Sequence, residues 1–186
     1  MRRINGRRDR AWLEQLFDQH GRHLRAFAVR RVGADAADDV VSEVFATAWR
    51  RRDDVPDEPL AWLFQTARHR VMHHLRGGTR RATLQATVRR DAQPTSAPSA
   101  EDQTRLLVEA ILDGLPATEA EILRLTVREE LTPSEIAVVL EITPGAARTR
   151  LMRARQRAQG LYEAALLAGD ADTTTANIAE HCSPQA

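Results

Sequence analysis

The chain contains no lysine, one cysteine and only 4% aromatic residues among its 186 residues. With Cys182 as the sole cysteine, no intramolecular disulfide can form, which fits a reducing compartment. No apolar run approaches the length of about 18 residues that a membrane-spanning helix requires. The basic N-terminus is not followed by the apolar stretch of a secretion signal. We therefore expect a cytoplasmic protein without membrane insertion.

The sequence also lacks the usual signatures of an enzyme. It has no glycine-rich phosphate loop and no nucleophile–base pattern. His69 and His73 stand at i, i+4, a spacing that can hold a metal ion, but no cysteine or carboxylate lies nearby in sequence to complete the site. His181 and Cys182 are a weaker alternative for metal binding or oxidation. The prediction is a protein that is not an enzyme and has no cofactor and no metal site.

The apolar residues are present at helical spacing almost throughout the chain. Hydrophobic residues make up 42% of the composition, enough for a packed core. Three apolar stripes run over residues 13–28, 37–48 and 60–75, and no alternating strand pattern is visible. Asp35 is a candidate N-cap for the second helix, and Pro59 is well placed to start the third. The predicted fold class is all-α.

A change in composition divides this pattern into two helical domains. Gly77 and Gly78 are expected to stop the third helix, and the Pro-, Ser- and Ala-rich stretch that ends at Ala100 is typical of a flexible linker. A short helix over Ala82 to Arg90 is possible within it. The predicted boundaries are residues 10–77 for the first domain, 78–104 for the linker, 105–167 for the second domain and 168–186 for a disordered tail.

Charge is unevenly distributed, although the net charge is only +1. Arginines without any acid occupy residues 59–90 and 144–157, and acids gather in residues 35–58 and 101–141. Basic stripes beside acidic faces indicate a nucleic acid on one side and a protein partner on the other. The alternative is that each stripe is only a solvated helix face.

Residues 131–157 carry the clearest local signal. Thr132 can cap a helix, with Pro133 at its first position and Glu135 at the capping-box position. After a tight turn, Thr143 can cap a second helix, which is studded with arginines. This pattern is typical of a helix-turn-helix, and the alternative is an ordinary helical hairpin.

The turn itself holds one unfavourable residue. Glu141 falls where a left-handed backbone is expected, which would cost about 1 kcal/mol for a residue other than glycine.

Two segments of the N-terminal half carry a more specific signal than the helix-turn-helix alone. Residues 37–50, ADDVVSEVFATAWR, and residues 59–76, PLAWLFQTARHRVMHHLR, resemble two consecutive segments of the extracytoplasmic-function (ECF) sigma factors. Leu115-Pro116, residues 121–128 and residues 131–157 resemble the second conserved domain of that family. The resemblance covers residues 13–76 and 107–158, in the usual order and at the usual spacing.

The resemblance implies that the second helix docks on the clamp helices of the largest subunit of core RNA polymerase. The residues that would make this contact are Asp38, Asp39, Val41, Ser42 and Glu43. Their neighbours Val40, Val44, Phe45 and Trp49 are expected in the core. The alternative is that Asp38 and Asp39 merely favour the helix N-terminus through its dipole.

The resemblance also assigns promoter recognition to the third helix and to the helix-turn-helix. The loop over residues 51–59 would help build a pocket for a flipped base of the −10 element, with DNA contacts from Arg68, His69, Arg70, His73 and Arg76. His69 and His73 replace the family's usual Asn and Asp, so the −10 sequence preference cannot be transferred. Trp62 and Phe64 are expected in the core rather than as stacking platforms.

In the helix-turn-helix, the resemblance implies contacts to the −35 element. The candidates are Thr143, Arg148, Thr149, Arg150, Arg153 and Arg155. Arg148, Thr149 and Arg150 would read bases, and Arg153 and Arg155 would hold phosphates. The implied partners are core RNA polymerase, promoter DNA and an anti-sigma factor. The rival function is a conventional helix-turn-helix regulator that binds a palindrome as a dimer without polymerase.

Overall fold

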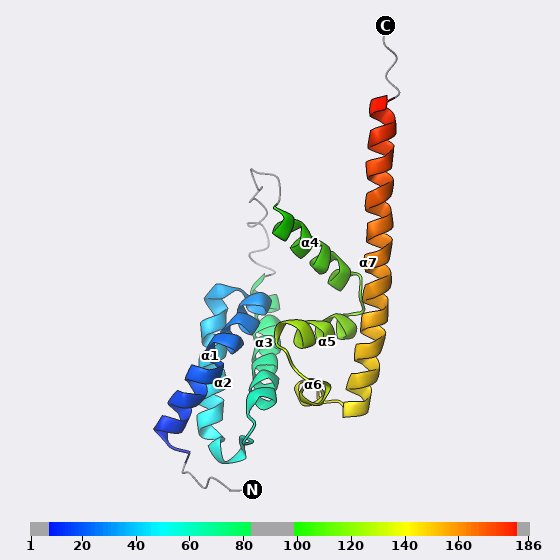
Figure 1. Ribbon diagram of the computed structural model, residues 1–186. Coiled ribbons are helices and arrows are strands. Elements are labelled where there is room, and N and C mark those ends of the chain that lie inside the picture. The colour runs from blue at the N-terminus through cyan, green and yellow to red at the C-terminus, as the bar shows by residue number, and fades with distance from the viewer. Residues whose placement is uncertain (1–7, 83–98, 182–186) are drawn as a thin grey trace. The chain divides into compact units, whose positions relative to one another are not determined.

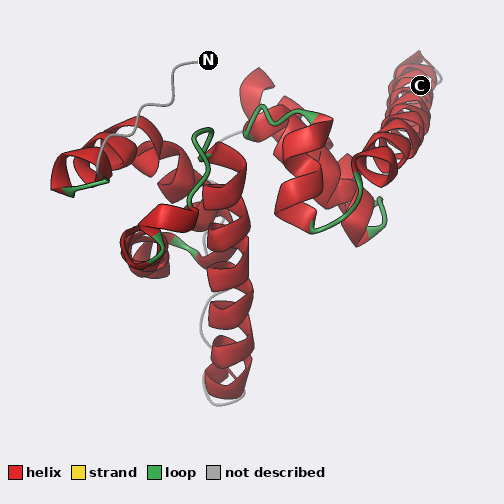
Figure 2. Cartoon of the chain, turned by 90° about the horizontal axis from the view of Figure 1, so that it is seen from below, coloured by secondary structure: helices red, strands yellow, loops and turns green. Residues whose placement is uncertain are grey.

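The structure is a computed structural model that describes residues 8–82 and 99–181, and these residues form helices joined by loops, without a strand (Figures 1 and 2). This confirms the all-α prediction. The elements, in chain order, are α1 (Arg10–Val32), α2 (Ala34–Arg50), the short 3-10 helix η1 (Arg52–Asp54), α3 (Leu60–Ala82), α4 (Ala100–Asp113), α5 (Ala117–Arg128), α6 (Pro133–Leu140) and α7 (Pro144–His181).

Backbone contacts divide the chain into two compact units. One comprises Met1–Ala92 with Thr126–Ala147, and the other comprises Gln93–Leu125 with Arg148–Ala186. Helices α1, α2 and α3 pack on one another in the first unit, where α6 also packs against α3. The boundaries drawn from the sequence at residues 77 and 105 stay a prediction.

The core of the first unit is built from the three predicted apolar stripes. Leu24, Phe27, Val44, Leu63 and Phe64 are at most 1% exposed. The rings of Phe27 and Phe64 meet edge to face with centroids 5.3 Å apart, a favourable geometry for aromatic pairs. This three-helix core fixes the orientation of the exposed edges of α2 and α3.

Local chemistry explains where the first helices begin and end. The Asp9 side chain accepts a hydrogen bond from the backbone N–H of Trp12 and caps α1. Gly33, with φ 81°, ends α1 and also stands at the N-cap of α2, so the prediction of Asp35 as that cap was wrong. Asp35 lies in the first turn of α2, where its charge suits the helix dipole. Pro59 directly precedes α3 and accepts from the N–H of Leu63, as expected for a helix start.

Two helices extend further than the sequence predicted. Helix α3 continues through Gly77 and Gly78 to Ala82, because glycine weakens a helix by about 1 kcal/mol but does not break it. Helix α7 continues to His181, where a disordered tail was predicted from residue 168. The four alanines among residues 168–181 favour helix, whereas Gly169 and three consecutive threonines oppose it, so composition alone does not explain this extension. Most of the predicted linker, including most of the possible helix over 82–90, lies outside the described residues.

In the second unit, the buried side chains of α4 and α5 include Leu112, Ile122 and Leu125. Glu119 on α5 is buried and pairs with Arg157 on α7. The distance between Arg157 Nη1 and Glu119 Oε1 is 3.0 Å. The second carboxylate oxygen of Glu119 has no hydrogen-bond partner among the described residues. A buried carboxylate needs such a counter-charge, so this pair connects α5 to the helix that follows the turn.

Candidate polymerase and promoter interfaces

Helix α2 exposes an acidic edge. Asp38, Asp39, Ser42 and Glu43 are all exposed along it. Two of these acids are held by arginines of neighbouring helices. Arg25 Nε on α1 lies 2.7 Å from Asp38 Oδ1, and Arg70 Nη1 on α3 lies 3.4 Å from Glu43 Oε2. The hydrogen bond that Arg25 donates to Asp38, and after it the charge of that carboxylate, raise the pKa of Arg25.

The same helix corrects two predictions. Val41, expected to be partly exposed for polymerase contact, is buried with 7% of its surface exposed. It follows Val40 on the inner side of α2, so it supports the edge from within. Trp49, expected in the core, is 39% exposed, and the Arg52 guanidinium lies 5.2 Å from the centre of its ring. The other predicted core residues of α2, Val44 among them, are buried.

The predicted −10 residues do not share one face of α3. His69, His73 and Arg76 are exposed and Arg68 is half-buried. Arg70 turns toward α2 instead, where it meets Glu43 and its Nη2 donates to Thr47 Oγ1 over 3.1 Å. Helical geometry explains this, because residues 69, 73 and 76 fall on one side and residue 70 falls on another.

Of the two aromatic residues of α3 that were expected in the core, one is fully buried and the other only partly. Phe64 is buried and Trp62 is half-buried, so Phe64 is confirmed as a core residue.

Within the first unit, His69 Nε2 lies 3.4 Å from Glu141 Oε2, and Gln65 donates to Glu141 Oε1 over 3.1 Å.

His69 and His73 are the two histidines of α3 that stand at a metal-binding spacing. The described residues contain no group of three His, Cys, Asp or Glu side chains that could hold a metal ion. Cys182 lies outside the described residues. None of the helices within residues 8–82 and 99–181 is both long and apolar enough to cross a bilayer.

The helix-turn-helix forms with the predicted caps. Thr132 and Glu135 make a reciprocal capping box at the start of α6, and Thr143 Oγ1 accepts from the N–H of Ala146 over 3.2 Å at the start of α7. Glu141 ends α6 in the left-handed conformation, with φ 56° and ψ 42°, as the sequence predicted. Leu151 and Ala154 are buried, so the rotation of α7 about its axis is set by its apolar side.

Four arginines flank this apolar side of α7 and are open to solvent, with Arg148 and Arg155 on one flank and Arg150 and Arg153 on the other. We define the arginine row as Arg148, Arg150, Arg153 and Arg155, all of which are exposed, as is Thr149 beside them. Within the described part of the chain, no salt bridge holds any member of the row. Thr143 is exposed as well, but its hydroxyl already caps α7. These cations are therefore available to phosphates and bases without breaking an internal pair.

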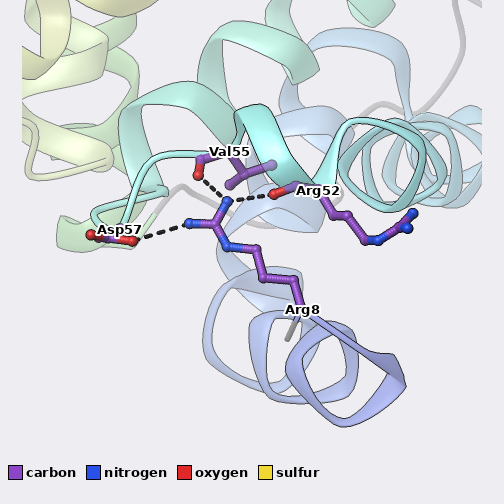
Figure 3. Close-up of polar contacts among 4 residues, drawn as sticks. All are labelled: Arg8, Arg52, Val55 and Asp57. Atoms are coloured by element: carbon purple, nitrogen blue, oxygen red, sulfur yellow. Dashed lines mark hydrogen bonds and ion pairs between the residues drawn. The ribbon is translucent and has the colours of Figure 1, made fainter. Parts of the chain in front are cut away.

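Sequence reasoning missed three charged residues that shape these surfaces. Arg8 binds the loop that precedes α3, Arg25 holds Asp38, and Arg157 neutralises Glu119 (Figure 3 for Arg8). Each acts on a residue at least 13 positions away, as in the Arg25–Asp38 pair. No local pattern of the sequence signals such contacts.

Comparison with known families matches two segments of the chain. Residues 16–81 match Sigma-70 region 2, and residues 105–157 match Sigma-70, region 4. The first match covers α2 with the acidic edge, and the second covers α6 and the arginine row of α7.

Two curated proteins are similar in sequence. A probable RNA polymerase sigma factor, RfaY of Xanthomonas campestris pv. campestris, is 33% identical over 70% of this chain, but the chain spans only 34% of that protein's length. The RNA polymerase sigma factor NccH of Alcaligenes xylosoxydans xylosoxydans is 31% identical over 80% of this chain and 86% of the relative.

Two solved structures share the fold. The sigma factor RpoE, crystallised with the anti-sigma factor NepR from Bartonella quintana, has a TM-score of 0.58 at 23% identity, covering 81% of this chain and 96% of that one. CnrH, in complex with the cytosolic domain of CnrY, has a TM-score of 0.59 at 26% identity, covering 84% and 90%.

Proposed function

The chain belongs to the RNA polymerase sigma factors of the ECF type, which are transcription initiation factors, and we propose a specific division of labour among its surfaces. The acidic edge of α2 docks on core RNA polymerase. Helix α3 and the loop before it engage the −10 element, and α7 holds the −35 element as duplex. The observation that carries this proposal is the opposite charge of the exposed α2 edge and the arginine row, each within one of the two matched regions.

The α2 edge suits a basic protein partner. Asp39 is exposed, and within residues 8–82 and 99–181 no cation lies within salt-bridge distance of it. Asp38 and Glu43 are already held by arginines, so docking there exchanges one counter-charge for another. Such exchange fixes register and partner choice more than it raises affinity. Asp39 is therefore the acid of this edge that would gain a counter-charge only when the partner binds.

The surface of α3 suits single-stranded DNA. His69, His73 and Arg76 share one exposed side, and this side can follow a phosphate backbone. Arg70 is left out of this contact set because Glu43 and Thr47 hold it. We assign it the role of tying the −10 helix to the polymerase-docking helix.

The arginine row suits duplex DNA. The capped N-terminus of α7 brings backbone N–H groups and the positive end of the helix dipole to the DNA backbone. Arg148 and Arg150, nearest that end, are assigned to guanine edges, where arginine binds two acceptors at once. Arg153 and Arg155, further along, are assigned to phosphates.

An anti-sigma protein is the further partner that we infer. One of the solved relatives was crystallised with a protein that carries that name. The proposed site of action is the cytoplasm, where core polymerase and chromosomal DNA are found.

The test is run-off transcription with sigma-free core RNA polymerase, on DNA from upstream of the gene that encodes this chain. Asp39→Arg is the decisive variant, because it reverses an exposed charge without breaking an internal pair. Asp18→Arg is the matched control, since Asp18 is an exposed acid of the same helical bundle that lies on α1. We expect a discrete transcript that Asp39→Arg abolishes and Asp18→Arg preserves.

Two results would count against the proposal. An active Asp39→Arg variant would remove the docking assignment to the α2 edge. A chain that shifts the same DNA as a dimer, and yields no transcript with any core polymerase, would point instead to a conventional helix-turn-helix regulator.

A further inference from the structure

The loop between α2 and α3 is short and polar, and its sequence alone does not fix its conformation. Residues 51–59 read RRDDVPDEP. Within the loop, the N–H of Asp54 donates to the Arg51 carbonyl over 2.8 Å to form η1, and Val55 is its one buried anchor at 2% exposure. Beyond η1, the chain must still turn toward Pro59 and the start of α3. Backbone groups in such a turn that are shielded from water need partners from elsewhere in the molecule.

Arg8 supplies those partners. Its Nη1 donates to the carbonyl oxygens of both Arg52 and Val55, and its Nη2 lies 3.1 Å from Asp57 Oδ1 (Figure 3). The Arg8 side chain is only 20% exposed, whereas Asp57 is fully exposed. The two carbonyl contacts therefore contribute more than the ion pair, which solvent screens. One planar guanidinium thus connects three positions of the loop.

The position of Arg8 is itself fixed. It directly precedes Asp9, the N-cap of α1, and its guanidinium carbon lies 5.4 Å from the centre of the Trp12 ring. The cap and the ring hold the Arg8 backbone and side chain in place beside the loop. Arg8 also lies before residue 16, where the match to Sigma-70 region 2 begins, so the family match does not assign it a role.

We propose that Arg8 is a positioning residue that holds the loop over residues 51–59 in the conformation that receives a flipped −10 base. This inference rests on the proposed function. The inference assigns Arg8 no DNA contact of its own, because its Nη1 and Nη2 are turned to the two carbonyls and to Asp57. A base pocket made of loop backbone must be ordered before the base arrives, or binding must supply the ordering entropy. Arg8 provides that order in advance.

Lysine is expected to replace Arg8 poorly. Its ammonium is a compact point charge, whereas the guanidinium fork reaches neighbouring acceptors in fixed directions. Arg8→Lys keeps the charge but loses part of the loop contacts, so its defect should lie between those of the wild type and Arg8→Ala. Arg10→Ala is the matched control. It removes the same charge two positions away, from a residue that pairs only with Glu14 of its own helix among the described residues.

The first experiment measures loop order in the free chain. Trypsin cleaves after arginine, and the loop offers Arg51 and Arg52. We expect Arg8→Ala to raise the cleavage rate at these sites about tenfold, the factor that follows from losing two modest hydrogen bonds. Arg10→Ala should leave the rate unchanged. Equal cleavage in Arg8→Ala and the wild type would overturn the inference.

The second experiment measures base discrimination by holoenzyme. Promoter fragments unpaired across the −10 element are prepared with each of the four bases in turn at the non-template positions. We expect Arg8→Ala to reduce the ratio of affinities between the best and the worst base, with Arg8→Lys intermediate and Arg10→Ala unchanged. Core polymerase binding should stay the same in all variants. A loss of core binding in parallel with discrimination would show a general folding role and overturn the inference.

The failures are distinguishable. If wild-type holoenzyme shows no base preference at any −10 position, the proposed function of the loop fails and the inference fails with it. If the wild type discriminates and Arg8→Ala discriminates equally well despite faster cleavage, only the role of Arg8 is overturned.

Discussion

The acidic edge of α2 and the arginine row of α7 are both exposed and charged, but they hold their charges differently. Arg25 and Arg70 pair with two of the four polar residues of the α2 edge. Within residues 8–82 and 99–181, no salt bridge holds Arg148, Arg150, Arg153 or Arg155. A paired surface gains specificity on binding, whereas unpaired cations gain affinity by displacing counterions from DNA. The difference fits a protein partner for α2 and a nucleic acid for α7.

The greatest loss is expected on the α2 side, from a substitution in the core that supports the acidic edge. Phe64→Ala empties a site that is 1% exposed and packed against Phe27, and we expect it to cost about 3–5 kcal/mol of unfolding free energy. Urea denaturation monitored by tryptophan fluorescence measures this loss, because all three tryptophans, Trp12, Trp49 and Trp62, lie in α1, α2 and α3.

Phe17→Ala is the control for this measurement. It removes the same ring from a site that is 52% exposed, so a much smaller loss is expected. Equal losses from the two variants would contradict the assignment of the core.

On α7, two substitutions separate base recognition from phosphate binding. Arg150→Ala should weaken −35 binding by about 1–3 kcal/mol and relax base preference at one position, without changing stability. Arg155→Ala should weaken binding to all sequences alike and reduce the slope of log affinity against log salt by about 1. Fluorescence anisotropy with −35 duplexes over a salt series, using holoenzyme, distinguishes the two. A sequence-specific loss in Arg155→Ala would reverse the two assignments.

Arg157 tests whether an arginine paired with a carboxylate contributes to the free energy of unfolding. Arg157→Ala leaves the carboxylate of Glu119, whose side chain is 11% exposed, without its counter-charge. Because Arg157 itself is 57% exposed, the expected loss of stability is only about 1–2 kcal/mol. Urea denaturation followed by circular dichroism measures it. The double variant Arg157→Ala with Glu119→Gln should recover part of the lost stability. If it does not, the unpaired carboxylate of Glu119 is not the cause of the loss.

Much of this fold follows from local rules that the sequence displays. The capping box of Thr132 and Glu135, the cap by Thr143 and the left-handed Glu141 were all predicted, because each depends on residues three or four positions apart. Helix extent was predicted less well. Gly77 and Gly78 do not stop α3, since glycine only weakens a helix and other forces decide its end.

For the candidate sites, the sequence predicted which segments carry them, but not how every side chain within those segments is placed. The exposure of the arginine row follows from helical periodicity around Leu151 and Ala154. The burial of Val41, the exposure of Trp49 and the turning of Arg70 toward Glu43 depend on how α2 packs between its neighbours. The same holds for the contact of Arg8 with a loop 44 or more positions away. Tertiary packing of this kind leaves no periodic signal in the sequence.

Glu141→Gly should stabilise the turn that leads into α7. The residue has φ 56°, a conformation that costs about 1 kcal/mol for residues with a Cβ and little for glycine. The exposed contacts of Glu141 with Gln65 and His69 are lost as well, so the net gain should be at most about 1 kcal/mol. Urea denaturation is the measurement, and Glu141→Ala, which keeps the Cβ, is the control. A destabilised glycine variant would show that the contacts outweigh the strain.

The smallest expected effect concerns His20 on α1, within the bundle that supports the α2 edge. Burial, and then the nearby charge of His23, lower the pKa of His20 below its ordinary value of 6.5. Above that value the imidazole is neutral in both the folded and the unfolded chain, so it does not alter stability. As the pH falls below it, the unfolded chain takes up a proton that the folded chain resists, and stability decreases. The urea midpoint should therefore fall more between about pH 7.5 and pH 5.5 in the wild type than in His20→Gln. His23→Gln removes only the secondary cause and should give an intermediate slope, whereas equal slopes in all three proteins would show that His20 titrates normally.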